Sequence, residues 1–355
     1  MRRLLPPVLA ALLAAAATAG LFLAWDGLPG KGGSAHSYSV GFWGDLPYSD
    51  EQREEGGPNL IDDMNRSNLA FSVHAGDVKS GEAECKDDVY EQAEEYFEGL
   101  EAPNAYTPGD NEWTDCDRNP KYSSRERLDH VREALFDTDR SFGRREVRLE
   151  VQGPPEQPYT ENRRWRIGGV TYATLHVVGS NNNLSDVAPD RGEFEERNEA
   201  TTRWMRETFE QAEDDNAEAV LLTAQANPGF DRFDPERAPM RDPRTLEADV
   251  KGPDPDGGDG FDEFLRELRD QAREFRRPVV LVTGDSHYFR VDKPLQDEEG
   301  RRIENLTRVE VPGDNPHNGN NDVQWVEILV DSREREVFSF RPRVVPDNRV
   351  AVPAP

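Results

Sequence analysis

Positive charge is scarce in this 355-residue chain. Lys and Arg number 43 against 71 Asp and Glu, which gives a formal net charge of −28. A protein of this sign is not expected to bind nucleic acid, or an anionic membrane surface, through general electrostatics, because both are negatively charged. A local basic pocket remains compatible with the composition.

Apolar residues are also few, at 35% of the chain. Low hydrophobicity with high charge is typical of disordered proteins. Here, however, the apolar residues gather in strand-like runs and helical stripes, so we expect a folded chain. The length allows one large domain or two ordinary ones. One compact domain over residues 37–345, followed by a Pro-rich tail at 346–355, is the more economical expectation.

Only two cysteines are present, Cys85 and Cys116. They lack the CxxC spacing of thiolate zinc sites, which disfavours a metal-binding role for the pair. Each follows a predicted strand that ends in Gly-Asp, at Asp77 and at Asp110. If these strands are neighbours and the chain is exported, the two cysteines can form a disulfide between their loops. Both interpretations stay open at the level of the sequence.

The N-terminus begins with Met-Arg-Arg, and residues 4–25 form a long apolar run. A basic end before such a run is typical of an exported chain, and the run is long enough to span a bilayer. Residues 17–19 offer a cleavage site, but the apolar run continues past them. We therefore expect residues 1–25 to be a signal peptide or a membrane anchor, with a linker at 26–36. The protein is expected in the periplasm, outside the cell, or attached to the outer face of the cytoplasmic membrane.

Apolar periodicity predicts alternating strands and helices. The expected strands are residues 38–43, 69–74, 104–107, 164–167, 170–178, 219–223, 278–283, 304–311, 324–330 and 336–340. The expected helices are residues 59–64, 86–100, 124–136, 190–215 and 261–275. The last three strands follow one another without helices, like the edge of a second sheet. A stretch rich in Pro, Asp and Gly at 231–260 is expected to be a long loop.

Four predicted strands run into Gly-Asp, at Asp45, Asp77, Asp110 and Asp285. In open α/β sheets, ligands bind at the edge where the parallel strands end. If the four loops converge there, their like charges cannot all stay ionised unless something positive is bound among them, and a divalent cation is the simplest candidate. The alternative is that Gly-Asp ends these strands only because both residues favour turns.

In their order, these motifs resemble those of the calcineurin-like metallophosphoesterase family, which run Asp-x-His, Gly-Asp-x-x-Asp, Gly-Asn-His-Asp/Glu, a lone His and Gly-His-x-His. The resemblance extends over residues 44–293. It implies an α/β fold of the four-layer αββα type, in which two mixed β-sheets are flanked by helices. The metal ligands that it implies are Asp45, Asp77, Asp110, Gln225, Asp285 and His287. The catalytic positions that it implies are Asn111 and Glu112.

The chain departs from the family at most of its histidine positions. Those positions are occupied by Pro47, Asn111, Gln225 and Asp285. Ser80 stands at the second Asp of Gly-Asp-x-x-Asp, and His287 is the one site histidine that remains. Oxygen donors at most ligand positions shift the expected preference from Zn or Fe to Mg, Mn or Ca, with one or two ions bound. This set of substitutions resembles a divergent exported bacterial branch of the family.

The activity implied by the resemblance is hydrolysis of a phosphoric monoester or diester. A bound cation would activate a water molecule, which attacks the phosphorus of a small phosphorylated substrate. Lys79, Arg290 and Lys293 lie near the Gly-Asp turns and are candidates for binding the phosphoryl oxygens. Glu112 could donate a proton in place of the missing His at Asn111.

Other interpretations of these residues stay open. The Lys79 ammonium could replace a metal among the carboxylates, which would leave a ligand-binding protein without catalysis. A bound calcium ion could instead stabilise an exported structural protein. Arg290 and Lys293 could form no more than a surface charge pair with Asp292.

Overall fold

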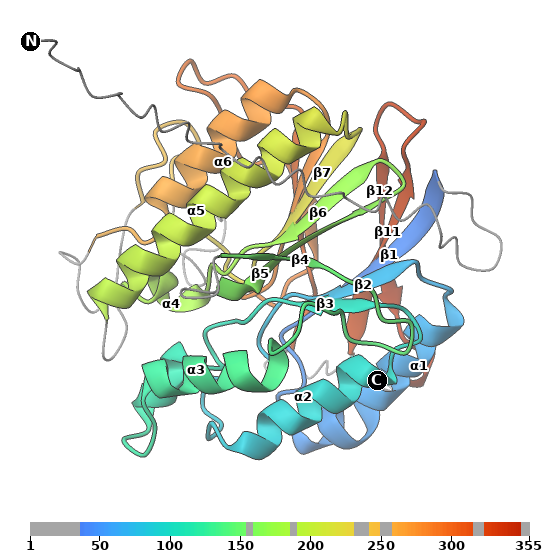
Figure 1. Ribbon diagram of the computed structural model, residues 1–355, viewed down its shortest axis with the longest axis vertical. Coiled ribbons are helices and arrows are strands. Elements are labelled where there is room, and N and C mark those ends of the chain that lie inside the picture. Colours follow the sequence, from blue (N-terminus) through green and yellow to red (C-terminus); the bar gives the residue numbers. More distant parts are fainter. Residues whose placement is uncertain are drawn as a thin grey trace, which may run out of the picture.

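Two β-sheets pack face to face between two layers of helices (Figure 1). The computed structural model describes residues 36–153, 159–184, 190–230, 241–248, 258–314 and 323–348. The predicted fold class, with two mixed sheets flanked by helices, is confirmed. The expected signal peptide or anchor at 1–25, most of the linker, and most of the loop at 231–260 lie outside the described residues, as does most of the tail at 346–355. The single domain over 37–345 stays a prediction.

The first sheet has the strand order β12-β11-β1-β2-β3. Its strands are β1 (Ser37–Trp43), β2 (Phe71–His74), β3 (Asn104–Tyr106), β11 (Gln324–Asp331) and β12 (Phe338–Val344). β1, β2 and β3 run parallel, whereas β11 pairs antiparallel with both β1 and β12. The three parallel strands therefore end at the same edge.

The second sheet has the order β4-β5-β6-β7-β8-β10-β9. Its strands are β4 (Glu150–Gln152), β5 (Tyr159–Ile167), β6 (Val170–Thr174), β7 (Ala219–Thr223), β8 (Val279–Thr283), β9 (Arg290–Asp292) and β10 (Leu306–Glu310). β6, β7, β8 and β10 are parallel neighbours. The expectation that the last three strands share one sheet is wrong for β10, which pairs with β8, so that Glu310 lies opposite Thr283. Proximity in sequence did not reveal this partner, because β9 lies between β8 and β10 along the chain.

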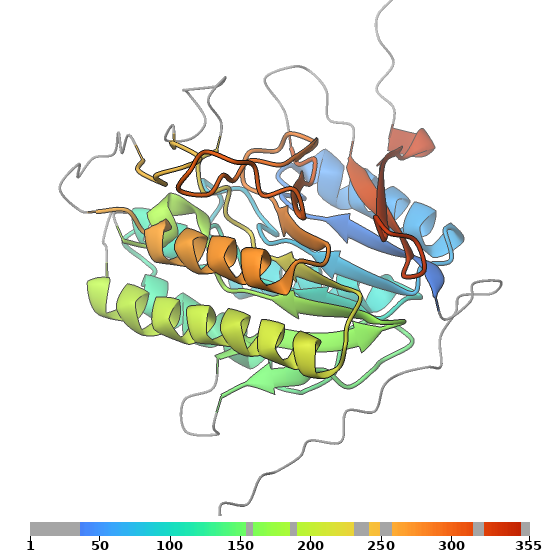
Figure 2. The ribbon, with the colours of Figure 1, turned by 90° about the horizontal axis from the view of Figure 1, so that it is seen from above.

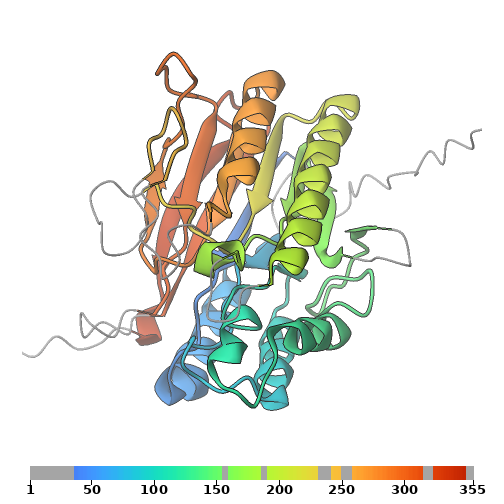
Figure 3. The same cartoon turned by 90° about the vertical axis from the view of Figure 1, so that its left-hand side faces the viewer.

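Helices cover the outer face of each sheet (Figures 2 and 3). The first sheet is covered by α1 (Gly57–Arg66), α2 (Asp87–Gly99) and α3 (Ser124–Leu135), and the second by α5 (Arg191–Asp214) and α6 (Asp262–Phe275). In α6, buried side chains recur at helical spacing at Phe264, Leu265, Leu268, Ala272 and Phe275. This apolar stripe places the helix on the sheet, with its charged face towards water.

The interior between the sheets is apolar and is fixed by aromatic contacts. Phe71 of the first sheet stacks on Trp165 of the second, with ring centroids 4.6 Å apart. The Tyr38 hydroxyl reaches across to Ile167 O over 2.7 Å and lies 2.9 Å from the Tyr172 hydroxyl. These contacts set how one sheet lies over the other, and so they align the edges at which the parallel strands end.

Cys85 and Cys116 form a disulfide, as predicted, with their Cα atoms 5.7 Å apart. Both are buried. The bond joins the segment after β2 to the segment after β3, which carry Asp77 and Asp110 respectively. Among the described residues, none of the helices has the length and apolar character needed to cross a membrane.

The disulfide closes a loop between cysteines 31 positions apart. On the chain-entropy model, replacing both cysteines by serine should lower the free energy of unfolding by about 3 to 4 kcal/mol. Urea unfolding of Cys85→Ser/Cys116→Ser beside the oxidised wild type measures the difference. Wild type in excess reductant is the control and should approach the double variant; equal midpoints for all three samples would contradict the expectation.

Candidate functional site

The parallel strands of the two sheets bring the Gly-Asp turns to one edge. Asp45 follows β1, Asp77 follows β2, Asp110 follows β3 and Asp285 follows β8. The Asp45 N–H donates to Gly76 O over 2.9 Å. The Asp285 N–H donates to Asp45 Oδ1 over 3.0 Å, which joins the first sheet to the second.

Three of these aspartates have a left-handed backbone. The angle φ is 54° at Asp45, 62° at Asp77 and 73° at Asp285. Residues other than glycine rarely adopt this conformation, which costs about 1 to 3 kcal/mol at each position. Strain that recurs at several strand ends along one edge is typical of binding and catalytic sites.

Asp77 and Asp110 are joined by the side chain of Gln225. Gln225 Nε2 lies 3.0 Å from Asp77 Oδ2 and 3.1 Å from Asp110 Oδ1. Gln225 Oε1 accepts the Gly179 N–H over 2.6 Å. Because a backbone N–H can only donate, the amide must present its N–H groups, and not its oxygen, to the two carboxylates. Gln225, predicted as an oxygen ligand, acts as a hydrogen-bond donor in this arrangement.

Further donors saturate the same two carboxylates. Asp77 Oδ2 accepts the Tyr48 hydroxyl over 3.0 Å, and Asp77 Oδ1 accepts the Asn111 backbone N–H over 3.2 Å. Asp110 Oδ2 accepts the Ser180 hydroxyl over 2.8 Å. Sequence reasoning missed Tyr48 and Ser180. The available signals were the position of Tyr48 just after the first Gly-Asp and the polar run at 179–183.

Glu112, predicted as a catalytic acid, braces the turn that carries Asp77. Its carboxylate accepts the N–H of Val78, that of Gly109 over 2.6 Å and that of Asp77 over 3.2 Å. Burial raises the pKa of Glu112, while these backbone N–H groups and the Lys79 charge act in the opposite direction. A carboxylate that accepts three backbone N–H groups is held in place and has little capacity left for a substrate.

Asn111, the other predicted catalytic residue, is held through its side-chain amide. Its Nδ2 donates to the Tyr48 hydroxyl and to the Lys79 carbonyl, both over 2.9 Å. An amide is not an acid, so Asn111 can orient a neighbouring group but cannot deliver a proton. The neighbour that it orients is Tyr48, whose ring lies edge-on to His287 at a centroid distance of 5.1 Å.

The other side of the site holds Asp45, Asp285, His287 and Glu310. His287 Nε2 lies 3.8 Å from Asp45 Oδ1. Asp45 is fully buried, and its Oδ2 has no hydrogen-bond partner among the described residues. Asp285 Oδ2 accepts the Asn227 N–H over 3.0 Å. Glu310, the last residue of β10, was not predicted as a site residue. It stands between Val309 and Val311 and is not part of a Gly-Asp motif.

Negative charge is in excess across this edge. Burial, together with neighbouring carboxylates, raises the pKa of Asp45 and of Asp77 well above the ordinary value. Loss of hydration and the charge of Asp110 raise the pKa of Asp285 to about 8. Carboxyl groups in such surroundings either bind protons or attract a cation.

The three predicted phosphoryl-binding cations lie in different surroundings. Lys79 is buried, its Nζ donates to Ser80 O over 3.0 Å, and burial lowers its pKa. Arg290 Nε lies 3.6 Å from Glu310 Oε2, at the edge of the cluster. Lys293 Nζ donates to Glu304 O and to Thr307 Oγ1. Thr307 lies near the start of β10, whereas Glu310 is its last residue. Lys293 is therefore turned away from the carboxylates.

A divalent cation fits one side of this site better than the other. Within the described residues, no group of three or more His, Cys, Asp or Glu is already arranged to hold a metal ion. Asp45 nevertheless offers Oδ2, a carboxylate oxygen without a partner among the described residues, which suits a hard cation. Its other oxygen, Oδ1, lies 3.8 Å from His287 Nε2. Between Asp77 and Asp110 the space is taken by N–H groups, which repel a cation.

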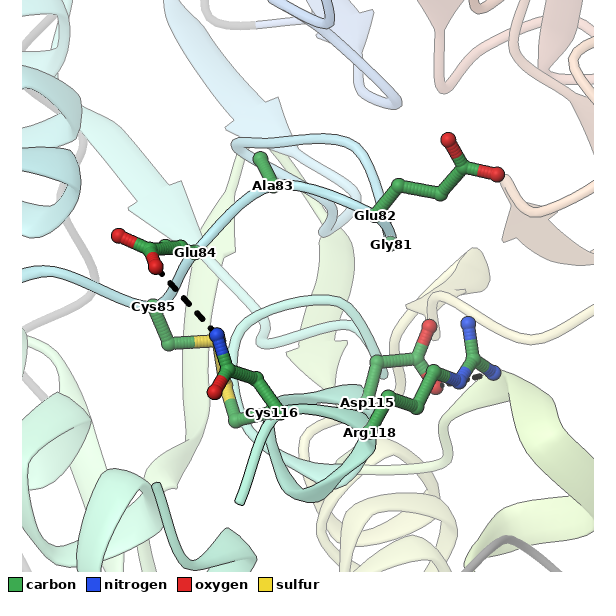
Figure 4. A pocket seen from close by; sticks show the side chains of 9 residues that line it. Gly81, Glu82, Ala83, Glu84, Cys85, Asp115, Cys116 and Arg118 are labelled. Carbon is green, nitrogen blue, oxygen red and sulfur yellow. Dashed lines mark hydrogen bonds and ion pairs between the residues drawn. A yellow bond between two sulfur atoms is a disulfide. The ribbon is translucent and has the colours of Figure 1, made fainter. Parts of the chain in front are cut away.

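A cavity of about 270 Å³ borders the site on the disulfide side (Figure 4). It lies between the segment 81–85 and the turn 115–119. Arg118 lines it, with Nη2 2.6 Å from Asp115 Oδ1. Asp115 Oδ1 also accepts the Ser180 hydroxyl over 3.1 Å, so Ser180 links this cavity to Asp110.

A largely buried network of ion pairs and hydrogen bonds packs next to the turn 179–183. Glu161 Oε1 lies 2.8 Å from His176 Nδ1 and 2.6 Å from Arg132 Nη2. Arg197 Nη1 donates to His176 O over 3.1 Å and also donates to Asn182. All four residues from Ser180 to Asn183 have positive φ, and Arg197 connects the network to this turn at Asn182.

Comparisons with known proteins give no family. No family model matches the chain, and no curated protein is similar enough to match. Solved structures overlap weakly. GAP50, the anchor in the inner membrane complex of Plasmodium, has a TM-score of 0.46 at 9% identity, covering 87% of this chain and 89% of its own. A dimetal phosphatase from Danio rerio has a TM-score of 0.45 at 12% identity, and the match covers 87% of this chain and 99% of the phosphatase chain.

A purple acid phosphatase from yellow lupin has a TM-score of 0.47 at 10% identity, and the match covers 89% of this chain and 54% of the lupin protein. Two of these three proteins are phosphatases by name. At TM-scores below 0.5 these similarities carry no argument about activity, so function has to be argued from the residues themselves.

Gly109 allows the turns that carry Asp77 and Asp110 to approach each other. A methyl group at Gly109 would overlap Asp77 Oδ1. Gly109→Ala should therefore lower the free energy of unfolding by about 1 to 3 kcal/mol, as overpacking does in well-packed interiors. The measurement is urea unfolding monitored by circular dichroism.

Gly99→Ala is the matched control, because the nearest heavy atom to its new methyl group, Ile61 Cγ2, would be 3.5 Å away. Gly99 lies at the end of α2, where alanine is preferred by about 0.5 to 1 kcal/mol. Equal stability changes for the two variants would show that the close approach at Gly109 is not needed.

The Glu161 network should make stability depend on pH. Burial opposes ionisation of Glu161, but Arg132 and His176 outweigh it and hold its pKa well below the ordinary value. A carboxylate whose pKa is depressed on folding stabilises the protein above about pH 4.5, and this contribution is lost as the pH falls further.

Glu161→Gln should lower the free energy of unfolding at pH 7 by about 3 to 5 kcal/mol, because it leaves the largely buried Arg132 guanidinium without its carboxylate partner. The difference from wild type should shrink between pH 4.5 and pH 2.5 in urea titrations. Glu95→Gln, at an exposed position on α2, is the control and should match wild type within about 0.5 kcal/mol. A difference that does not change with pH would contradict the assignment.

Proposed function

We propose that this protein is a cation-dependent phosphoester hydrolase. The observation that carries the proposal is the buried Asp45 Oδ2, which lacks a hydrogen-bond partner and lies in a cluster of carboxylates whose pKa values are raised. Leaving such an oxygen unsatisfied costs about 1 to 3 kcal/mol or more, unless a ligand completes its surroundings. A divalent cation meets that need and offsets the excess negative charge.

The residues that would hold the cation are Asp45, Asp285 and His287. When bound, it would supply an activated water for attack on phosphorus and would offset charge on the phosphoryl oxygens. Mn, Mg or Ca suits this oxygen-rich set better than Zn or Fe does. The substrate class is a small phosphoric monoester or diester.

Other side chains would bind and orient the substrate. Tyr48 is half-buried beside Asp77 and His287; its hydroxyl accepts from Asn111 and donates to Asp77, so it would orient the Asp77 carboxylate towards the substrate. Arg290 lies beside Glu310 with its guanidinium over the exposed ring of Tyr288, at 5.4 Å from the ring centroid. It is the cation best placed to reach a phosphoryl oxygen from solvent. Glu112 contributes by holding the Asp77 turn.

A second candidate function is binding without catalysis. It is favoured by the Gln225 amide, which satisfies Asp77 and Asp110 with neutral donors instead of a metal. A protein of this kind would bind a ligand or be stabilised by calcium, and would hydrolyse nothing. The two candidates differ in whether bound cation leads to turnover.

We further propose that the protein acts outside the cytoplasm. The buried disulfide supports this location, because such bonds persist mainly in oxidising compartments. The predicted signal peptide or anchor at 1–25 would direct the chain there.

The test of the hydrolase proposal uses p-nitrophenyl phosphate and bis(p-nitrophenyl) phosphate with Mn, Mg or Ca added singly to chelator-treated protein. We expect hydrolysis that requires a cation and falls roughly 100-fold or more in Asp45→Asn. Asp62→Asn, an exposed position on α1, is the control and should retain wild-type activity. Cation binding without hydrolysis of either ester would favour the non-catalytic function; hydrolysis that persists in Asp45→Asn would exclude Asp45 as the centre.

A further inference from the structure

The two sides of the carboxylate cluster differ in how their oxygens are satisfied. On the Asp77 and Asp110 side, Gln225 donates to both carboxylates, and Tyr48 and Ser180 add hydroxyl donors. On the Asp45 side, one carboxylate oxygen is buried and has no partner among the described residues. The first side already has the donors that a cation would have to displace, whereas the second side leaves Asp45 Oδ2 without a donor.

The orientation of the Gln225 amide cannot be reversed in place. Its Oε1 is held by the Gly179 N–H at 2.6 Å. Turning the amide over would place Nε2 against that N–H and Oε1 against two carboxylates, which would replace three hydrogen bonds by three repulsive contacts. The amide is also confined by the backbone, since a methyl group on Gly76 would lie 2.6 Å from Gln225 Cγ.

We infer that this site takes up one divalent cation, on the side of Asp45, Asp285 and His287, and that the Gln225 amide fills the space between Asp77 and Asp110 in which a second cation would bind. Gln225 is then a positioning residue: it joins the two carboxylates and, through Gly179, ties them to the strand β6 that precedes the turn 179–183. The inference rests on the cation dependence in the proposed function and limits how many ions that function uses.

Two properties of the side chain explain why glutamine suits this place. Its two N–H groups match one oxygen on each carboxylate, which removes the direct contact of two like charges without adding an ion. Its oxygen satisfies a backbone N–H that would otherwise be buried without an acceptor. A glutamate at this position would keep the second property and lose the first, because both of its oxygens accept.

The test is Gln225→Glu, which changes the shape of the side chain little. The new carboxylate can still accept the Gly179 N–H, but its other oxygen must face Asp77 and Asp110, so the three carboxyl groups must bind a proton or a cation between them, and excess Mn²⁺ favours the cation. The experiment measures bound Mn²⁺ by metal analysis after dialysis, together with the Mn²⁺-induced rise in the midpoint of thermal unfolding. It requires no turnover.

We expect about one equivalent of Mn²⁺ per chain in wild type, about two in Gln225→Glu, and a larger thermal shift in the variant. Gln211→Glu on α5 is the matched control for the added charge and should bind as wild type does. Asp45→Asn in the wild-type background should lose the bound ion. If Gln225→Glu folds only with Mn²⁺ present, it is prepared with the ion; Gln225→Ala, which removes the bridging donors, should also gain an equivalent.

Two equivalents in wild type, or one in both Gln225→Glu and Gln225→Ala, would overturn this inference while leaving the hydrolase proposal in place. No bound Mn²⁺ in wild type would overturn both. Loss of the ion in Gln225→Glu, instead of a gain, would show that Gln225 supports the Asp45 side, and it would contradict the division of the site into two sides.

Discussion

Burial of negative charge is the condition on which the rest of this site depends. Asp45, Asp77, Asp110, Glu112 and Glu310 are all buried along one edge, with Asp285 and His287 closer to water. Each carboxylate there must be protonated, hydrogen-bonded or paired with a cation, because a low dielectric strengthens repulsion between like charges. The structure meets this condition differently at each position: with backbone N–H groups at Glu112, a side-chain amide at Asp77 and Asp110, and a guanidinium near Glu310.

The sandwich makes this concentration of charge possible. Parallel strands in both sheets direct their ends to one edge, and the aromatic contacts between the sheets align the two edges. The loops there contain aspartates with a left-handed backbone conformation, which is unfavourable for residues other than glycine. They also contain a glycine, Gly109, that has no room for a methyl group. The disulfide and the Glu161 network lie just behind these loops and supply rigidity where the turns themselves are strained.

Much of the fold follows from local patterns. The strands before Asp45, Asp77 and Asp285 are apolar runs that end at Gly-Asp, and α6 is predicted by its apolar stripe. The sequence predicted the wrong sheet for strand β10, because a parallel partner is not joined to it by a short turn and so cannot be recognised from the neighbouring sequence. For the same reason Glu310 was missed: only the pairing with β8 brings it beside the Gly-Asp turn at Asp285.

By itself, the sequence determined the layered α/β architecture, the Gly-Asp strand ends and the residues able to form a disulfide, since these depend on periodicity, turn chemistry and composition. Only the tertiary structure decided what each side chain does. Glu112 accepts backbone N–H groups, Lys293 donates to the far part of β10, and Gln225 presents hydrogens where an oxygen was expected. The physical reason is that a hydrogen bond depends on direction: the Gly179 N–H, 46 positions away in the sequence, orients the amide.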